Sequence, residues 1–165
     1  IVSKFRSFLA ILKRFFSPST NNMKINSAGL ELIKSFEGCK LEAYKDIVGV
    51  WTVGFGHTGN DVYEKQRISQ EEAEELLKDD LCKFEAGVAS LLKVKVSENQ
   101  FSALVSFAYN LGLGNLKSSL LLRCINKNNV VGAEGEFKKW NHAGGKVVEG
   151  LTRRREAEAK LFSTG

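Results

Sequence analysis

The chain reads FEGCKLEAYKDIVGVWTVGFGHTG over residues 36–59, and the spacing of its apolar residues changes within this stretch. Up to its start, apolar residues recur at the spacing of one helix face, at Leu30, Ile33 and Phe36. Between residues 41 and 57, β-branched and aromatic residues are punctuated by glycines, which is typical of short strands joined by turns. We therefore predict a helix that begins at residue 26 or 27 and ends near Glu37, with Gly38 as its stop, followed by a β-meander of two or three strands.

The chain beyond residue 68 has helical patterns throughout. The first two helices are each expected to begin with a capping box, at Ser69-Gln70-Glu71-Glu72 and Ser97-Glu98-Asn99-Gln100. In a capping box, the serine side chain and a glutamate or glutamine side chain three residues later accept hydrogen bonds from free backbone amides at the start of the helix. Gly112 is expected to end the second, and further helices are predicted over residues 118–126, 130–141 and 151–162. The fold class is therefore α+β: a small sheet lobe and a larger helical lobe, with a cleft between them.

Composition indicates a soluble globular protein. The 165 residues, of which 43% are hydrophobic and 26% charged, suffice for one domain or for two small lobes that share a core. The net charge of +5 is uneven, because residues 1–22 carry four basic side chains and no acidic one. The remaining chain has no extended basic face with interleaved aromatics, so we expect no nucleic-acid partner.

Residues 1–16 have the pattern of a cationic amphipathic helix that precedes the main domain. The apolar side chains share one arc, but no apolar run approaches the roughly 20 residues that a spanning helix needs, and no signal cleavage site follows. Binding to an anionic membrane surface fits this pattern, and so does docking on the body or a remnant of a longer targeting segment. Residues 17–22 read as a polar linker, which divides the chain into 1–22 and a domain over 23–165. Met23 is a candidate start of a shorter chain.

Two carboxylates in the opening stretch, Glu37 and Asp46, are of the kind that cleaves glycosidic bonds. That chemistry needs one carboxyl group that stays protonated and one that stays ionised. Glu37 ends a helix beside apolar residues, which favours the protonated form, whereas Asp46 lies in a polar turn. The hydroxyl of Thr52 could hold a water beside Asp46. The ordinary alternative is that Glu37 is a helix-end charge and Asp46 a turn former, and spacing alone does not separate the two.

Several blocks occur in order and at regular intervals between residues 23 and 162. They are Glu37-Gly38, Tyr44-Lys45-Asp46, Gly49-Val50-Trp51-Thr52-Val53-Gly54, Gly56-His57-Thr58-Gly59, Phe107-Ala108-Tyr109-Asn110-Leu111-Gly112, Trp140 to Gly145, and Gly150-Leu151-Thr152-Arg153-Arg154-Arg155-Glu156. Together they resemble the catalytic signature of phage-type lysozymes, the muramidase endolysins that dissolve peptidoglycan at the end of infection. The resemblance implies a lysozyme-like fold.

The resemblance also implies roles for individual residues. Glu37 would be the general acid, and Asp46 and Thr52 would position the attacking water. The family is usually described as inverting, so the two carboxyl groups are expected to stand about 6.5–9.5 Å apart. Arg155, or its neighbour Arg154, falls where the family places an arginine that pairs with the catalytic glutamate, and such a pair would favour the ionised form of Glu37.

Other positions have supporting roles or fit more than one interpretation. By resemblance, His57 would buttress the sheet lobe, and Tyr109 and Asn110 would contact sugar rings, although helix core and helix-end positions explain them nearly as well. His142 reads as a surface residue, and the two histidines have no ligand pattern, so we expect no metal and no cofactor. The three cysteines fit neither a disulfide framework nor a zinc site and are expected to be buried and reduced, at Cys39, Cys82 and Cys124.

The resemblance implies a monomeric glycoside hydrolase that cleaves the β-1,4 bond between N-acetylmuramic acid and N-acetylglucosamine. Such an enzyme is made in the cytoplasm of the infected host and acts on peptidoglycan in the periplasm or cell wall. One alternative is a lytic transglycosylase, which cuts the same bond without water and forms an anhydro sugar. The other is a membrane-active antibacterial protein that acts through residues 1–16.

Overall fold

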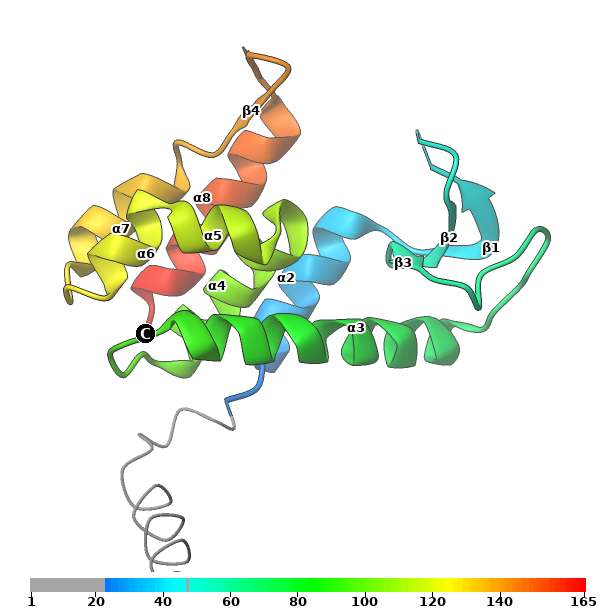
Figure 1. The fold of residues 1–165 in the computed structure, drawn as a ribbon, viewed down its shortest axis with the longest axis horizontal. Helices are drawn as coiled ribbons and strands as arrows, with labels where there is room; N and C mark the ends of the chain where they lie inside the picture. Colours follow the sequence, from blue (N-terminus) through cyan, green and yellow to red (C-terminus); the bar gives the residue numbers. More distant parts are fainter. Residues whose placement is uncertain (1–22, 47) are drawn as a thin grey trace, which may run out of the picture.

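The structure is a computed structural model that describes residues 23–46 and 48–165. Figure 1 shows a small sheet near one end of the long helix α3 (Gln70–Leu91), with the shorter helices gathered around the other end. This arrangement confirms the predicted α+β fold with a sheet lobe and a larger helical lobe. The predicted amphipathic helix over residues 1–16 and the linker over 17–22 lie outside the described residues, so both stay predictions.

Helix α2 (Ser27–Glu37) carries the chain into the sheet lobe and has the predicted bounds. Asn26 caps its start, where the side-chain oxygen accepts a hydrogen bond of 3.0 Å from the Gly29 amide. Gly38 ends it with φ of 67°, a left-handed conformation that glycine adopts without strain. Because the helix stops there, Glu37 is its last residue and lies where the two lobes meet.

The sheet consists of three antiparallel strands in the order β1 (Lys40–Lys45), β2 (Trp51–Gly54) and β3 (His57–Thr58). The predicted β-meander is therefore confirmed. In the central strand, Thr52 pairs with Tyr44 on one side and with Thr58 on the other. Its residues 52–54 are buried, so β2 is the part of the sheet that packs against the rest of the protein.

Helices α3 and α4 (Glu98–Leu111) form the centre of the helical lobe. Both predicted capping boxes are present, with Ser69 and Ser97 as caps, and Gly112 ends α4 with φ of 89°. Residues 101–108 of α4 are all buried, and the helix packs against α2, α3 and α8 (Glu149–Ser163). The core therefore surrounds α4, which also carries two buried serines, Ser102 and Ser106.

The segment after Gly112 contains more breaks than the sequence predicts. Residues 113–125 form two short helices, α5 (Leu113–Ser118) and α6 (Leu120–Ile125), where one helix over 118–126 was expected. Ser119 separates them, since its hydroxyl accepts a hydrogen bond of 3.0 Å from the Leu122 amide and so caps α6. Helix α7 (Val130–Phe137) also ends before residue 141.

The prediction that the chain is helical throughout beyond residue 68 is wrong at residues 142–147. These residues form a hairpin of two strands, β4 (His142–Ala143) and β5 (Lys146–Val147), joined by Gly144 and Gly145. Both glycines have positive φ, as two-residue hairpin turns require. The Gly-Gly pair is the signal in the sequence that could have predicted this hairpin.

The cysteines differ from expectation. Cys39 and Cys82 are exposed and Cys124 is half-buried, and none of the three forms a disulfide. Cys39 lies in the exposed connection beyond Gly38, and Cys82 lies on the outer face of α3, so the predicted burial is wrong for both. Within the described ranges, every helix is too short or too polar to cross a bilayer.

Candidate active site

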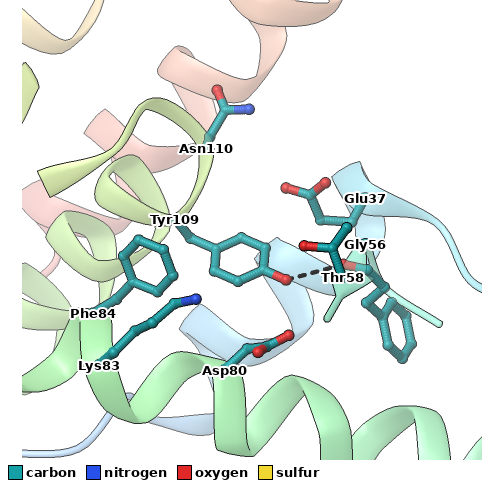
Figure 2. Close-up of a pocket in the computed structure, with 9 residues that line it drawn as sticks. Glu37, Gly56, Thr58, Asp80, Lys83, Phe84, Tyr109 and Asn110 are labelled. Atoms are coloured by element: carbon teal, nitrogen blue, oxygen red, sulfur yellow. Dashed lines mark hydrogen bonds between the residues drawn. The ribbon is translucent and has the colours of Figure 1, made fainter. Parts of the chain in front are cut away.

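A hollow of about 260 Å³ lies between the two lobes (Figure 2). The sheet side and the end of α2 contribute Glu37, Phe55, Gly56 and Thr58, and the helical lobe contributes Asp80, Lys83, Phe84, Tyr109 and Asn110. A second hollow of about 560 Å³ is bounded by the ends of α2 and α4 and by the first turns of α8. Glu37 and Asn110 line both hollows, so the two meet at these residues and form an elongated cleft.

Glu37 occupies the junction of the two hollows with its side chain 23% exposed. Its Oε1 accepts a hydrogen bond of 2.6 Å from Nη1 of Arg154. Its Oε2 faces the backbone of Gly56, where an added Cβ atom would lie 4.0 Å away. One carboxylate oxygen is therefore held by a cation, while the other points toward the sheet side of the cleft.

Arg154, and not Arg155, is the partner of Glu37. Arg155, the first of the two arginines predicted to pair with Glu37, makes no hydrogen bond to it, so a pair through Arg155 is wrong, whereas the pair through its neighbour Arg154 exists. Successive side chains on a helix point about 100° apart. Arg154 consequently points toward the end of α2, and Arg155 points away from it toward Asn110 and Glu158.

Asp46 forms the turn between β1 and β2. Its Oδ1 accepts hydrogen bonds of 2.9 Å from the amides of Val48 and Val50. Thr52 is 4% exposed, and its hydroxyl donates a bond of 3.1 Å to the Val50 carbonyl. The structure thus brings Asp46 and Thr52 to the same turn, whereas neither lines the two hollows that contain Glu37. Their catalytic roles stay predictions, and Asp46 also acts as the turn former that the alternative interpretation described.

Tyr109 lies on the floor of the cleft and connects the lobes. Its hydroxyl donates a hydrogen bond of 3.0 Å to the Phe55 carbonyl, and its ring packs edge-on against Phe84 with centroids 5.2 Å apart. Burial raises the pKa of Tyr109 far above its usual range, and the charges of Glu37 and Asp80 add to this effect. The hydroxyl therefore stays protonated and is occupied by a contact within the protein, so a ligand in the cleft would meet the ring of Tyr109.

Asn110 presents an amide group to both hollows. Its Oδ1 accepts a hydrogen bond of 2.9 Å from Nη2 of Arg155. An arginine can only donate, so the amide oxygen has to face it and the amide nitrogen has to face away. Figure 2 shows this nitrogen directed to the side on which Glu37 lies. Asn110 therefore offers a hydrogen-bond donor to a ligand in the cleft.

His57 connects strand β3 to helix α3 and to the following loop. Its Nδ1 lies 2.8 Å from Asp80, and its Nε2 lies 3.1 Å from Asp61. Burial by itself would lower the pKa of His57, but the hydrogen bonds and charges of the two aspartates outweigh it, so the pKa is raised above 6.5. The predicted supporting position of His57 agrees with these contacts. Asp80, which also lines the cleft, was not predicted, because nothing in the sequence relates it to a histidine 23 residues earlier.

We expect His57 to make the stability of the protein depend on pH. Its raised pKa contributes stability that is fully present below about pH 6.5 and is lost as the pH rises through the folded-state pKa. The His57→Asn variant should therefore lose more unfolding free energy relative to the parent at about pH 5.5 than at about pH 9. Denaturant titrations at both pH values measure this difference. His142→Asn, which changes an exposed histidine, is the matched control. An equal loss of unfolding free energy at both pH values would contradict ion pairs between His57 and the two aspartates.

Glu158 and Ser106 are further residues at the site that the sequence did not reveal. Glu158 is fully buried and lies within 3.3 Å of both Arg154 and Arg155. Its spacing of three and four residues from the two arginines is a signal for helical ion pairs, but spacing does not show that the pairs are buried. Over residues 23–46 and 48–165, no group of three histidine, cysteine or acidic side chains could hold a metal ion.

Comparisons with known proteins agree with this geometry. A family model described as phage lysozyme matches residues 34–158. The chain is 55% identical over 145 residues to an endolysin of Bacillus phage B103, covering 87% of this chain. It is 42% identical over 129 residues to a SAR-endolysin of Bacteriophage PS119, covering 78% of this chain and 77% of that protein. The muramidase domain of SpmX from Asticaccaulis excentricus superposes with a TM-score of 0.82 at 38% identity, covering 87% of this chain and all of that domain.

A two-lobed α+β fold with a glutamate at the junction of the lobes defines a lysozyme-like protein. The chain belongs to the phage lysozyme family. It spans only 55% of the length of the Bacillus phage B103 endolysin.

Proposed function

We propose that this chain hydrolyses the β-1,4 glycosidic bond between N-acetylmuramic acid and N-acetylglucosamine in bacterial peptidoglycan. The observation that carries this proposal is the position of Glu37, whose carboxylate lies at the junction of two hollows with one oxygen held by Arg154. Two hollows that meet at one acid suit a glycan strand that is cut in its middle. The names of the relatives, endolysin and muramidase, support the same substrate.

In the proposed reaction, Glu37 donates its proton to the leaving glycosidic oxygen. The anionic Asp46 stabilises the positive charge that develops at the sugar carbon, and Asp46 and Thr52 position the attacking water. The oxygen of that water forms the new bond to the carbon, and its proton passes to Asp46. Asp46 accepts its turn hydrogen bonds through Oδ1, and the described residues make no hydrogen bond to its Oδ2, which suits this task.

The cleft also offers groups that would recognise the glycan. The amide nitrogen of Asn110 is placed to donate to an oxygen of the strand, such as an N-acetyl carbonyl. Tyr109 and Phe84 provide apolar ring surface beside it. A sugar ring has polar edges, which the Asn110 amide could bind, and apolar faces, which could pack on the aromatic rings.

The place of action follows from the substrate. The protein would be made in the cytoplasm of an infected host and would act as a monomer on the cell wall. The predicted amphipathic helix over residues 1–16 would bring it to an anionic membrane or outer-membrane surface. Deletion of residues 1–22 tests that role, since activity on intact Gram-negative cells should fall while activity on purified walls persists.

Product mass separates hydrolysis from transglycosylation. We expect peptidoglycan digested by the parent protein to give fragments with a free reducing end, because water is added across the broken bond. Mass spectrometry of the released fragments measures this directly. Fragments that are lighter by one water would instead indicate the anhydro sugar of a lytic transglycosylase and would overturn the assignment.

A further inference from the structure

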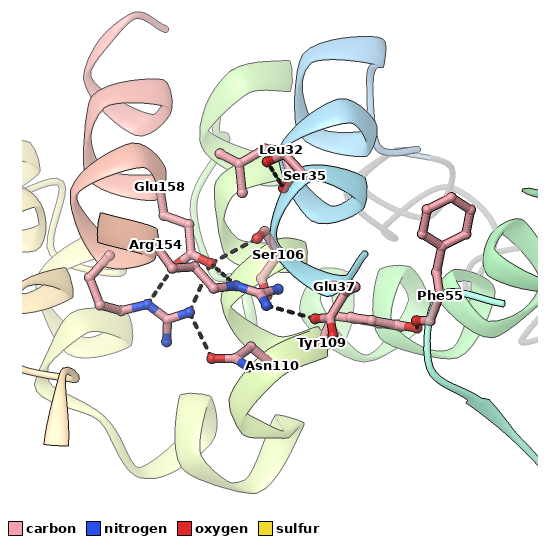
Figure 3. Close-up of polar contacts among 10 residues, drawn as sticks. Leu32, Ser35, Glu37, Phe55, Ser106, Tyr109, Asn110, Arg154 and Glu158 are labelled. Atoms are coloured by element: carbon pink, nitrogen blue, oxygen red, sulfur yellow. Dashed lines mark hydrogen bonds and ion pairs between the residues drawn. The ribbon is translucent and has the colours of Figure 1, made fainter. Parts of the chain in front are cut away.

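Glu158, on α8, receives an unusual number of donors for a fully buried carboxylate (Figure 3). Its Oε1 accepts hydrogen bonds of 2.7 Å from the Ser106 hydroxyl, 3.3 Å from Nε of Arg154 and 3.0 Å from Nη2 of Arg155. Its Oε2 lies 2.9 Å from Nε of Arg155. One carboxylate therefore contacts both buried arginines at once.

Charge requires this carboxylate to be ionised. Arg154 and Arg155 are 4% and 0% exposed, and arginines keep their protons in proteins. Burial raises the pKa of Glu158 above its usual range even though the two guanidinium charges and the Ser106 hydroxyl act to lower it, but the two arginines beside it cannot give up their protons. Glu37 is the other acidic residue in contact with this cluster, and it lies at the edge of the cleft. Glu158 is thus the counter-ion that allows both arginines to be buried.

Each arginine also reaches one residue of the cleft. Arg154 binds Glu158 through Nε and Glu37 through Nη1, so its planar guanidinium is held at two points. Arg155 shares its Nη2 between Glu158 and Asn110, and its guanidinium lies 5.1 Å from the centre of the Phe107 ring. Since a guanidinium is rigid, fixing one edge of it fixes the directions of the other N–H groups.

We infer that Glu158 is a positioning residue that orients Glu37 through Arg154 and Asn110 through Arg155. Glu158 is fully buried and lines neither hollow. The inference rests on the proposed function, because it assigns Glu37 and Asn110 the roles of acid and glycan contact. It adds that one buried carboxylate, from a different helix, controls both.

Stability by itself does not explain this cluster. Buried ion pairs are often no more stable than apolar side chains of similar volume. Here, Nη1 of Arg155 is buried without a hydrogen-bond partner among the described residues, so the arrangement does not satisfy its own polar groups. The hydrogen bonds that the arginines do form outside the cluster go to Glu37 and Asn110, and the reaction depends on the orientation of these two side chains.

The Glu158→Gln variant tests the inference. Glutamine keeps the shape but replaces one oxygen by an amide nitrogen, which cannot accept from Arg155, and it leaves the positive charge of Arg154 to act on Glu37 alone. We expect kcat to fall about 10- to 100-fold, because small displacements of reacting groups have effects of that size. We expect KM to rise, because Arg155 would no longer hold the Asn110 amide in the orientation that binds the glycan.

The matched control is Glu156→Gln, which changes an exposed glutamate on the same helix and should behave as the parent. An Asn110→Ala background separates the two routes, since the rise in KM caused by Glu158→Gln should vanish there while the fall in kcat remains. A purely structural role would lower the melting temperature but leave kcat and KM of the folded variant equal to those of the parent, and that result would overturn the inference.

If Glu158→Gln does not fold, the Ser106→Ala variant tests the same inference. It removes one donor to Glu158 without replacing any charged side chain. We expect a roughly 3- to 10-fold lower kcat, and kinetics equal to the parent would overturn the inference. The proposed function fails separately, if the parent releases no fragments from peptidoglycan or if Glu37→Gln retains full activity.

Discussion

We expect Glu37→Gln to lose roughly 10²- to 10⁴-fold in the rate of peptidoglycan cleavage, the range that general acid catalysis contributes. Glutamine keeps an oxygen that can accept from Nη1 of Arg154, so the contact between α2 and α8 should survive. It has no proton of suitable acidity to give to the leaving oxygen. Clearing of purified cell walls, followed by turbidity, measures the loss, and circular dichroism checks the fold.

Glu31→Gln is the matched control for this variant, because Glu31 lies on the same helix, is exposed and, among residues 23–46 and 48–165, forms an ion pair only with Lys34. It should clear walls at the rate of the parent. Clearing by Glu37→Gln at a comparable rate would show that Glu37 is a helix-end charge and not the acid. Loss of wall clearing with survival of cell killing would instead assign the killing to residues 1–16.

Asp46→Asn is expected to reduce the rate by about 10²- to 10³-fold, the size of effect that follows removal of one group that stabilises transition-state charge. Asparagine keeps the oxygen that accepts from the Val48 and Val50 amides, so the turn should persist. Only the negative charge is lost. Steady-state rates on purified peptidoglycan, with melting temperatures of parent and variant, measure the effect of charge apart from that of the turn.

The variant therefore separates the two interpretations of Asp46. If it served only as a turn former, Asp46→Asn would keep nearly full activity. Asp79→Asn is the control, since Asp79 is an exposed aspartate on α3 that makes no hydrogen bond or ion pair through its side chain within the described part of the chain. Equal rates for the two variants would remove Asp46 from the mechanism.

Local structure could be predicted where residues close in the sequence form hydrogen bonds with one another. The capping boxes at Ser69 and Ser97 involve residues three apart, and both form as predicted. Gly38 and Gly112 end their helices because each adopts a backbone conformation that other residues rarely reach. The hairpin at residues 142–147 obeys equally local rules, because its two turn glycines adopt the positive φ angles that a two-residue turn requires.

Exposure of individual side chains was less predictable. Cys39 and Cys82 are exposed although most free cysteines are buried, because Cys39 lies beyond a helix end and Cys82 lies on the outer face of α3. A residue's type favours one environment, but its position relative to the packed core decides the outcome.

By itself, the sequence determined that a helix ends near Glu37, that a short β-meander follows, and that Asp46 lies in a turn of that meander, because these features depend on contacts within a few residues. Only the tertiary structure decided that Arg154 reaches Glu37, that Glu158 binds both arginines, and that Asp80 binds His57. Glu37 and Arg154 are 117 residues apart in the sequence, and His57 and Asp80 are 23 apart. Arg154 and Arg155 are neighbours, so a small rotation of their helix would change which of them points toward Glu37. Burial then gives the contacts their strength, since charges that water no longer screens have to be compensated by the side chains that packing places beside them.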